Sequence, residues 1–230
     1  MASTESNEFI LNINSLLRNT NLSVSISNSC PIIKDECSDL DKAFSGSNVN
    51  IVLRENGKVV SCLGCDINED NTIIHITASC SARQSRRKGF NSLVRLILFN
   101  YAQSENINTI TADTNASSRP LMEKYLNARC TDQYMAPSYE INCIVDVSDP
   151  DTQRTVKNNM KTILQRFKQK IQTRRRIRSK TKSANDALKR SKQSRSSRSR
   201  SSRSRSSRSR SIRSRSMRSR SRPSRTARTR

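Results

Sequence analysis

The chain has 230 residues and a formal net charge of +24, but that charge is concentrated at one end. Residues 1 to 150 hold 13 Lys and Arg against 17 Asp and Glu, whereas residues 151 to 230 hold 30 against 2. This asymmetry predicts one compact domain followed by a basic arm for polyanions. No segment approaches the roughly 18 apolar residues of a membrane span. The N-terminus carries acidic residues where a secretory signal carries basic ones, so we expect an intracellular protein.

The first part of the domain predicts two helices and three strands. Apolar residues recur at helical spacing from Glu8 to Leu17, and SDLDKAFS favours a second, short helix. The apolar runs NVNIVLRE and KVVSCLGCDI flank an Asn-Gly pair, which is a strong hairpin signal. A third β-rich run, TIIHITASC, follows the turn NEDN. Together these three runs predict an antiparallel meander.

The second part of the domain alternates helices with strands. FNSLVRLILFNYAQSEN carries an apolar stripe at helical spacing, and the short strand INTITAD follows it. A second helix, NASSRPLMEKYLNA, and a closing strand, YEINCIVDV, complete the series. The sequence therefore predicts an α+β domain over residues 1–150, with a meander followed by helix–strand–helix–strand.

The cysteines are odd in number and scattered, which favours reduced, buried thiols over a disulfide framework. Cys62 and Cys65 in CLGC have the spacing of zinc ligands, and Cys30 and Cys37 offer two further thiolates. However, CLGC lies in an apolar strand, and there is no second pair with this spacing. We therefore predict structural thiols and no metal site. The seven cysteines are Cys30, Cys37, Cys62, Cys65, Cys80, Cys130 and Cys143.

A basic loop, SRRKGFNSLV, joins the third strand to the next helix. The N-terminus of a helix has unpaired backbone N–H groups and a partial positive charge, so it attracts anions. Gly89 permits a close backbone approach to an anion, and Arg86, Arg87 and Lys88 add charge beside it. The loop therefore suggests a phosphate site, and a solvated basic turn is the alternative.

Two stretches carry a resemblance to a known family. Residues 86 to 91 resemble the pyrophosphate-binding loop of the GNAT acetyltransferases, Arg/Gln-x-x-Gly-x-Gly/Ala, which lies between the fourth strand and the third helix of that family. NASSRPLMEK is similar to a second family motif, in which an Asn and a small residue open a helix near the acetyl-transfer point. The resemblance covers about residues 45 to 147 and implies a GNAT-like mixed sheet.

The resemblance implies acetyl-coenzyme A as the cofactor and an amine as the acetyl acceptor. The pyrophosphate would lie on the amides of the basic loop, and the backbone of the preceding strand would bind the pantetheine arm. The residues implied for cofactor binding are Cys80, Ser81, Ala82, Arg86, Arg87, Lys88, Gly89, Phe90, Asn91, Ser92 and Asn115.

The chain departs from the family at two positions. Asn91 replaces the final Gly or Ala of the loop, where its side chain crowds the phosphate or points away. Met122 stands where the family usually has the tyrosine that protonates the departing thiolate. Tyr125, three residues on, is the candidate substitute, and the alternative is a core aromatic residue.

Transfer to an amine also requires a group that accepts the proton of the amine. The only histidine is His75, and strand alternation places it on the same face as Thr77 and Ser79, so we expect it to point to the cleft. A structural histidine is the alternative. Glu69 and Asp70 in the preceding turn are competing bases, and a water relay would need none of these groups.

Beyond the domain, residues 151–178 read as a basic amphipathic helix. Its apolar stripe could pack on the domain, mediate dimerisation or accompany binding to a polyanion. Residues 179–230 contain too few apolar residues for a core, which predicts disorder.

Residues 194 to 222 are nearly pure Arg-Ser repeats, which predict nonspecific binding to nucleic acid through its phosphates. Their composition resembles protamine-like packaging proteins and nuclear Arg-Ser domains, which implies the nucleus or a virion and a kinase acting on the serines. A GNAT-like domain with such an arm resembles proteins of large DNA viruses. The arginines expected to contact nucleic acid are Arg195, Arg198, Arg200, Arg203, Arg205, Arg208, Arg210, Arg213, Arg215, Arg218 and Arg220.

The sequence thus predicts an N-acetyltransferase-like protein that is held on nucleic acid by its arm. The alternative is a non-catalytic packaging protein with a degenerate GNAT domain, which the two departures keep open.

Overall fold

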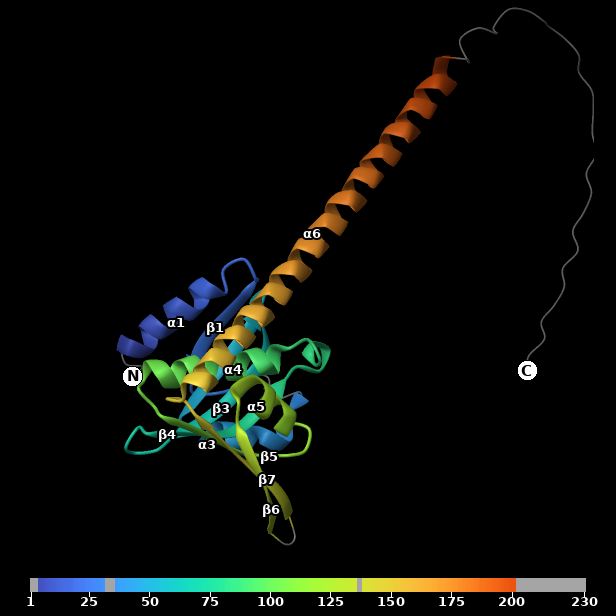
Figure 1. Ribbon diagram of the computed structural model, residues 1–230. Helices are drawn as coiled ribbons and strands as arrows, with labels where there is room; N and C mark the ends of the chain where they lie inside the picture. Colours follow the sequence, from blue (N-terminus) through green and yellow to red (C-terminus); the bar gives the residue numbers. More distant parts are fainter. Residues whose placement is uncertain (1–3, 32–35, 136–137, 202–230) are drawn as a thin grey trace, which may run out of the picture. The chain divides into compact units, whose positions relative to one another are not determined.

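The computed structural model describes residues 4–31, 36–135 and 138–201 (Figure 1). The chain divides into two units, of which the first ends at Arg176 and the second begins at Ile177. The first unit contains the sheet, the helices around it and the first part of the long C-terminal helix.

A mixed sheet forms the centre of the first unit. Its strand order is β1-β2-β3-β4-β5-β7-β6, and every neighbouring pair is antiparallel except β4 and β5, which are parallel. The predicted α+β class, with a meander followed by helix–strand–helix–strand, is confirmed. The strands are β1 (Leu22–Ser27), β2 (Val49–Glu55), β3 (Lys58–Ile67), β4 (Ile73–Ser81), β5 (Thr109–Thr114), β6 (Arg129–Met135) and β7 (Ser138–Asp146).

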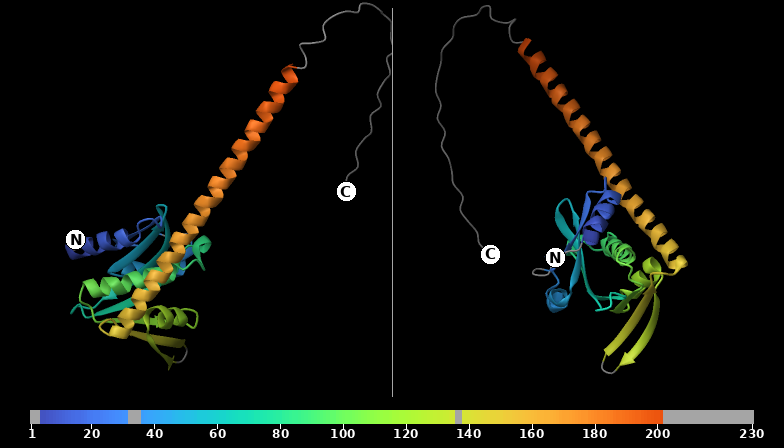
Figure 2. Two further views of the ribbon diagram at one scale, coloured as in Figure 1. Left: turned by 45° about the horizontal axis from the view of Figure 1, so that its top comes forward. Right: turned by 90° about the vertical axis from the view of Figure 1, so that its left-hand side faces the viewer.

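Helices cover both faces of the sheet. Figures 1 and 2 show α4 against one face with α1 and the start of α6 beside it, and α3 on the other face. The α-helices are α1 (Thr4–Leu16), α3 (Asp41–Gly46), α4 (Phe90–Ser104), α5 (Arg119–Leu126) and α6 (Pro150–Ser201). Two short 3-10 helices are η1 (Ser38–Leu40) and η2 (Arg83–Ser85).

The two faces bury cores of different size. The larger core joins the sheet to α1, α4, α5 and α6, and Phe9, Leu63 and Ile97 are among its buried side chains. The smaller core lies around Phe44 of α3 and includes Val52, Cys62 of β3 and Cys80 of β4. Because most of the apolar side chains of α4 are buried, this helix fixes the position of the loop that precedes it.

Two strands were not predicted from the sequence. β1 has the alternating pattern LSVSIS with Val24 buried, but it is short and rich in serine. β6 is largely polar and is defined by its pairing with β7 along its whole length, from Arg129 opposite Ile144 to Met135 opposite Ser138. Pairing between distant segments, and not local hydrophobicity, makes β6 a strand.

The apolar stripe of the C-terminal amphipathic segment packs on the domain, which was one of the three predicted options. The stripe is buried in the core, and the ring of Phe167 stacks on Phe90 with centroids 5.1 Å apart. Its buried residues are Val156, Met160, Ile163, Leu164, Phe167 and Ile171.

The second unit begins within α6. Disorder is predicted from residue 179 onward, whereas the structure describes helix as far as Ser201. Lys, Arg, Ala, Leu and Gln have good helix propensity, which accounts for helix without a core, and the side chains of residues 177–190 are exposed. The predicted disorder of 202–230 lies outside the described residues. None of the helices in the described ranges combines the length and apolar content that crossing a bilayer requires.

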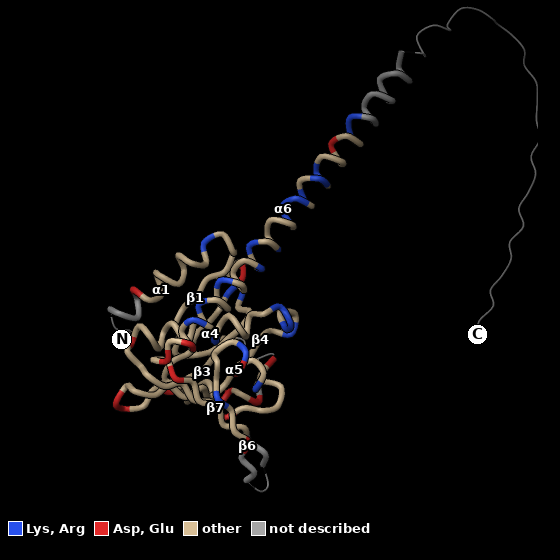
Figure 3. The backbone as a smooth tube through the Cα atoms, in the orientation of Figure 1, with Lys and Arg blue, Asp and Glu red and all other residues tan. Residues whose placement is uncertain are grey.

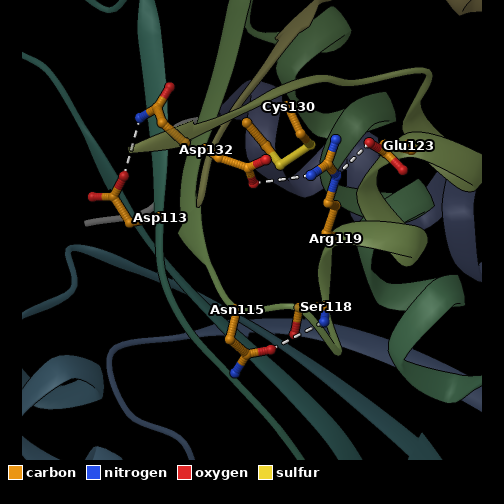
Figure 4. The surroundings of a disulfide bond; sticks show 9 residues. Asp113, Asn115, Ser118, Arg119, Glu123, Cys130 and Asp132 are labelled. Carbon is orange, nitrogen blue, oxygen red and sulfur yellow. Dashed lines mark hydrogen bonds and ion pairs between the residues drawn. A yellow bond between two sulfur atoms is a disulfide. The ribbon is translucent and has the colours of Figure 1, made fainter. Parts of the chain in front are cut away.

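The prediction that all cysteines are reduced is wrong for four of them. Cys130 of β6 lies directly opposite Cys143 of β7 and forms a disulfide with it (Figure 4). Cys37 and Cys80, which are 43 residues apart, form a second disulfide. The Cys130–Cys143 disulfide depends on the pairing of β6 with β7, and β6 was not predicted from the sequence.

Candidate functional site

The parallel strands β4 and β5 separate part-way along their length and open a wedge in the sheet. Their pairing runs from Ile73 with Thr109 to Ile76 with Ala112 and then stops. A cavity of about 360 Å³ fills the wedge, which we call the wedge cavity. It is lined by Leu40, Ile76, Thr77, Ala78, Ser79, Arg95, Ala112, Asp113, Thr114, Asn115, Ser118 and Met122.

A bulge in β4 changes which side chains share a face. Ala78 pairs with Gly64 and Ile76 with Cys65, so Thr77 is an extra residue in β4. The Thr77 hydroxyl lies 2.5 Å from that of Ser47, which follows α3, whereas Ser79 accepts a hydrogen bond from α4. The predicted alternation, with His75, Thr77 and Ser79 on one face, is therefore wrong beyond the bulge.

Beyond the bulge, β4 directs some of its backbone groups away from β3, and of these the Ser81 carbonyl accepts a hydrogen bond from Arg86 Nε at 3.4 Å. The N–H of Ala82 donates to Val60 of β3 at 3.1 Å, so alternate residues before it also direct their backbone groups to β3. It follows that the backbone groups of Ser79 and Ser81 face the opposite side, where β5 has diverged. Of the three strand residues predicted to bind pantetheine, Ser81 has this orientation, and Cys80 and Ala82 face β3.

Arg95, which the sequence analysis did not select, lies at the floor of the wedge cavity. Only 3% of its surface is exposed, and its Nη2 donates to Ser79 Oγ at 3.1 Å. Its Nε and Nη1 have no hydrogen-bond partner among the described residues. Burial lowers the pKa of Arg95 to about 10, so the guanidinium remains charged at neutral pH. An arginine within the apolar stripe of FNSLVRLILF was the signal that could have identified it.

The predicted phosphate loop enters α4 through a glycine in the left-handed region. Gly89 precedes the first residue of α4 with φ of +90°, and the N–H of Leu93 donates to Gly89 O at 3.0 Å. No described side chain caps this end of α4. The N–H groups of Phe90, Asn91 and Ser92 therefore come before the first bond of the helix and are suited to an anion.

Cations from two elements gather beside this helix end. A cavity of about 210 Å³, which we call the basic cavity, is lined by Arg87 and Lys88 from the loop and by Arg166 and Lys170 from α6. Figure 3 shows the basic residues of this loop and of α6. The α6 cations were not predicted for the site, although LQRFKQK places them on either side of the buried Phe167. The remaining lining residues are Gly89, Tyr125, Ile163 and Phe167.

The catalytic candidates lie in different places. Tyr125 lines the basic cavity, whereas Met122 is 1% exposed and lines the wedge cavity, so the structure does not bring Tyr125 to the position of Met122. His75 Nδ1 lies 3.0 Å from Thr111 Oγ1, and its Nε2 lies 3.8 Å from Asp113 Oδ2. His75 itself does not line the wedge cavity, but Asp113 does.

Asp113, another residue missed from the sequence, lies at the end of β5. Its Oδ1 accepts a hydrogen bond from Asn142 Nδ2 at 3.0 Å, and its side chain is 52% exposed. Figure 4 shows Asp113 and Asn115 on this segment, with Asn115 bonded to Ser118. Asn115 Oδ1 accepts from Ser118 N at 3.0 Å, which fixes the turn before α5.

Asn91 and two of the free cysteines have buried polar atoms in their side chains. Asn91 Oδ1 is buried without a hydrogen-bond partner among the described residues, so its carbonyl does not point into solvent. Cys62 is hydrogen-bonded to Cys30, and this bond together with burial raises the pKa of the Cys62 thiol. Burial also raises the pKa of Cys65. In the described part of the chain, no three His, Cys, Asp or Glu side chains are grouped to hold a metal ion.

Comparison with known proteins gives likenesses among solved structures. No protein-family model matches the chain. No curated protein sequence matches it either.

Three of the similar structures are acetyltransferases. A structure described as an IAA acetyltransferase from Bacillus cereus has 12% identity and a TM-score of 0.41, over 54% of this chain and 99% of its own. A Bacillus subtilis acetyltransferase in complex with CoA has 12% identity and a TM-score of 0.43, over 54% and 98%. A GNAT family acetyltransferase from Elizabethkingia anophelis with acetyl-CoA bound has 13% identity and a TM-score of 0.43, over 55% and 98%.

Proposed function

We propose that this protein is an acyltransferase that moves an acetyl group from acetyl-CoA to an amine. The observation that carries the proposal is that two features lie on one strand and the helix that follows it. One is a wedge toward which backbone groups of β4 are directed, and the other is an uncapped helix N-terminus beside a basic loop. An extended arm fits the first feature, and a pyrophosphate fits the second.

The chemistry of the residues at these positions, as well as their order along the chain, fits such a cofactor. The N–H groups of Phe90, Asn91 and Ser92 would receive the pyrophosphate, and the cations of the basic cavity would neutralise its charge. Backbone groups of Ser79 and Ser81 would hold the pantetheine arm. When bound, acetyl-CoA supplies a thioester for attack by the amine.

Asp113 is the group best placed to receive the proton of the amine. Asp113 lines the wedge cavity, and His75, which is not part of that lining, has its Nε2 3.8 Å from the Asp113 carboxylate. A carboxylate attracts an ammonium group and can accept its proton. His75 can then exchange the proton with solvent, because its side chain is 39% exposed.

Met122 favours a second candidate function. It is buried at the wedge cavity and has no proton to give to a departing thiolate. A protein that binds CoA without transferring its acyl group would have such a residue. In that case the C-terminal arm, with its arginines at residues 195–220, would carry the main function by packaging nucleic acid.

The arm has the same proposed role in both cases. Its charge is expected to hold the protein on nucleic acid without reading the base sequence, since Phe167 is the only aromatic residue beyond Tyr139 and is buried. Phosphorylation of its serines would reduce that charge, so a Ser kinase is a proposed partner.

The experiment compares Gly89→Asp with the wild-type full chain by calorimetry with acetyl-CoA. The substitution places a negative charge where the phosphate would bind, at a backbone φ of +90° that disfavours a side chain. We expect saturable binding by the wild type and loss of binding by the variant, while both keep the same far-ultraviolet circular dichroism. Both chains carry the same arm, so binding of CoA phosphates to the arm cancels. Equal binding of acetyl-CoA by the two chains would contradict the proposal. Release of the free CoA thiol when an amine is added would indicate a transferase, and binding without thiol release would indicate a CoA-binding protein.

A further inference from the structure

Arg95 is a buried cation whose charge is not balanced by an acidic partner in the described structure. Its Nη2 donates a hydrogen bond to the Ser79 hydroxyl, and its other two guanidinium nitrogens are enclosed without hydrogen-bond partners among the described residues. The same side chain lines the wedge cavity. Burial of an unpaired charge is costly, so a site of this kind gains most from an anionic ligand.

The Ser79 hydroxyl would lie between the Arg95 guanidinium and a ligand in the wedge cavity as a hydrogen-bonding link. Since Ser79 Oγ accepts the hydrogen bond from Arg95 Nη2, its own hydrogen is left to donate to an acceptor. Ser79 also lines the cavity, and the bulge at Thr77 is what turns it toward α4. A ligand oxygen in the cavity would therefore meet a hydroxyl that is polarised by a buried guanidinium.

The lining of the wedge cavity includes one positively charged and one negatively charged side chain. Arg95 is nearly fully buried at the floor, and Asp113, the acidic residue of the lining, is half-exposed on β5. A ligand with a carboxylate directed to Arg95 and an amine near Asp113 matches both charges, whereas an acetyl group alone leaves Arg95 unpaired.

We propose that the wedge cavity binds a ligand carboxylate through Ser79 and Arg95. This inference rests on the proposed function, because it assumes that an acyl-CoA and an amine meet in the cavity. The carboxylate belongs either to the acyl group of a dicarboxylic acyl-CoA or to an amino-acid acceptor. Acetyl-CoA is then a donor that leaves the Arg95 subsite empty or shares it with an acidic acceptor.

The test uses the full chain and two pairs of ligands of nearly equal size, in each of which one member ends in a carboxylate and the other in a neutral amide. The donor pair is carboxypropyl-CoA and carbamoylpropyl-CoA, which are stable thioethers ending in a carboxylate and in an amide. The acceptor pair is glycine and glycinamide, each added to protein saturated with propyl-CoA. Dissociation constants are measured by calorimetry for the wild type, Arg95→Met and Ser79→Ala.

We expect one of the two acids to bind about tenfold or more tightly than its amide, as is typical of a hydrogen bond to a charged group. The pair that shows the difference identifies the source of the carboxylate. Arg95→Met should abolish the preference, and Ser79→Ala should reduce it several-fold. Because Ser79→Ala leaves the buried charge in place, it serves as the test if Arg95→Met fails to fold.

Two results would overturn the proposal while leaving the CoA site intact: equal binding of acid and amide in both pairs, or a preference that persists in Arg95→Met. Failure of both thioethers to bind the wild type would instead refute the CoA site itself, and this inference with it. The C-terminal arm is identical in every variant, so its attraction for anions does not affect the comparison.

Discussion

The two cavities beside the loop between β4 and α4 use positive charge in different ways. In the wedge cavity Arg95 is 3% exposed, and two nitrogens of its guanidinium have no hydrogen-bond partner in the described part of the chain. In the basic cavity Arg87, Lys88, Arg166 and Lys170 are clustered, and the two from α6 are exposed. Exposed cations raise affinity for any polyanion and are screened by salt, whereas a buried cation discriminates by the geometry and charge of one ligand. The number of cations that line a cavity and its specificity for one ligand are therefore separate properties of this protein.

The largest expected effect comes from breaking the support that α6 gives to the basic cavity. Phe167→Ala should lower the free energy of unfolding by about 3 to 5 kcal/mol, because it removes a buried ring that stacks on Phe90. It should also weaken CoA binding through displacement of Arg166 and Lys170. Urea denaturation measures the first effect. Ile177→Ala, at a side chain 59% exposed, is the control and should change stability by less than about 0.5 kcal/mol. Equal stability of the two variants would show that α6 is not part of the core.

The second effect concerns the wedge cavity, which lies next to a disulfide. The double variant Cys37→Ser, Cys80→Ser should be less stable by about 3 to 4 kcal/mol, because the bridge closes a loop between residues 43 apart. Ligand binding in the wedge cavity should also weaken, although the variant changes none of the exposed cations. The reason is that Leu40 and Ala78 of the cavity lining lie close to the bridged cysteines in sequence. Thermal unfolding with and without reductant provides the measurement. If reductant leaves the wild-type melting temperature unchanged, the bridge is not formed in solution.

The third effect separates stability from binding at Arg95. Arg95→Met should stabilise the ligand-free protein by about 1 to 3 kcal/mol, because an unpaired buried charge is replaced by an apolar side chain of similar length. Burial lowers the pKa of Arg95 to about 10, so above that pH the unfolded chain binds more protons than the folded one. The penalty from Arg95 is therefore constant below about pH 10 and falls as the pH rises further. Urea denaturation at neutral pH and near pH 11 should show the difference between variant and wild type decreasing. A destabilised variant at neutral pH would indicate that Arg95 is already paired.

The smallest effect is expected at the exposed cations of α6. Charge reversal of both Arg166 and Lys170 to Glu should weaken CoA binding about tenfold at low ionic strength and less at high ionic strength. The double variant Lys161→Glu, Lys168→Glu changes the charge of the same helix by the same amount, at residues that line a different cavity, and it should have a smaller effect. Calorimetry at two salt concentrations makes the comparison. An equal loss in both variants would mean that α6 acts through its net charge alone.

The elements with strong local periodicity could be predicted from the sequence, and those defined by distant pairing could not. The meander, α4 and α5 follow from apolar patterns and turn residues, and the Gly89 loop follows from its place between strand and helix. β6 required its partner β7, and the bulge at Thr77 required the register with β3. Asp113 was missed because its place at the wedge depends on where the pairing of β4 with β5 stops, whereas Arg95 was missed although its position within an apolar stripe marked it.

Hydrogen exchange in the full chain, with and without acetyl-CoA, tests the central claim most directly. If the cofactor lies in the wedge and on the start of α4, the amides of Ser79, Ser81 and Phe90 to Ser92 should exchange more slowly when it is present. Gly89→Asp should show no such protection. Protection confined to the basic arm, with these amides unchanged, would contradict the account, because it would show that CoA is bound only as a polyanion.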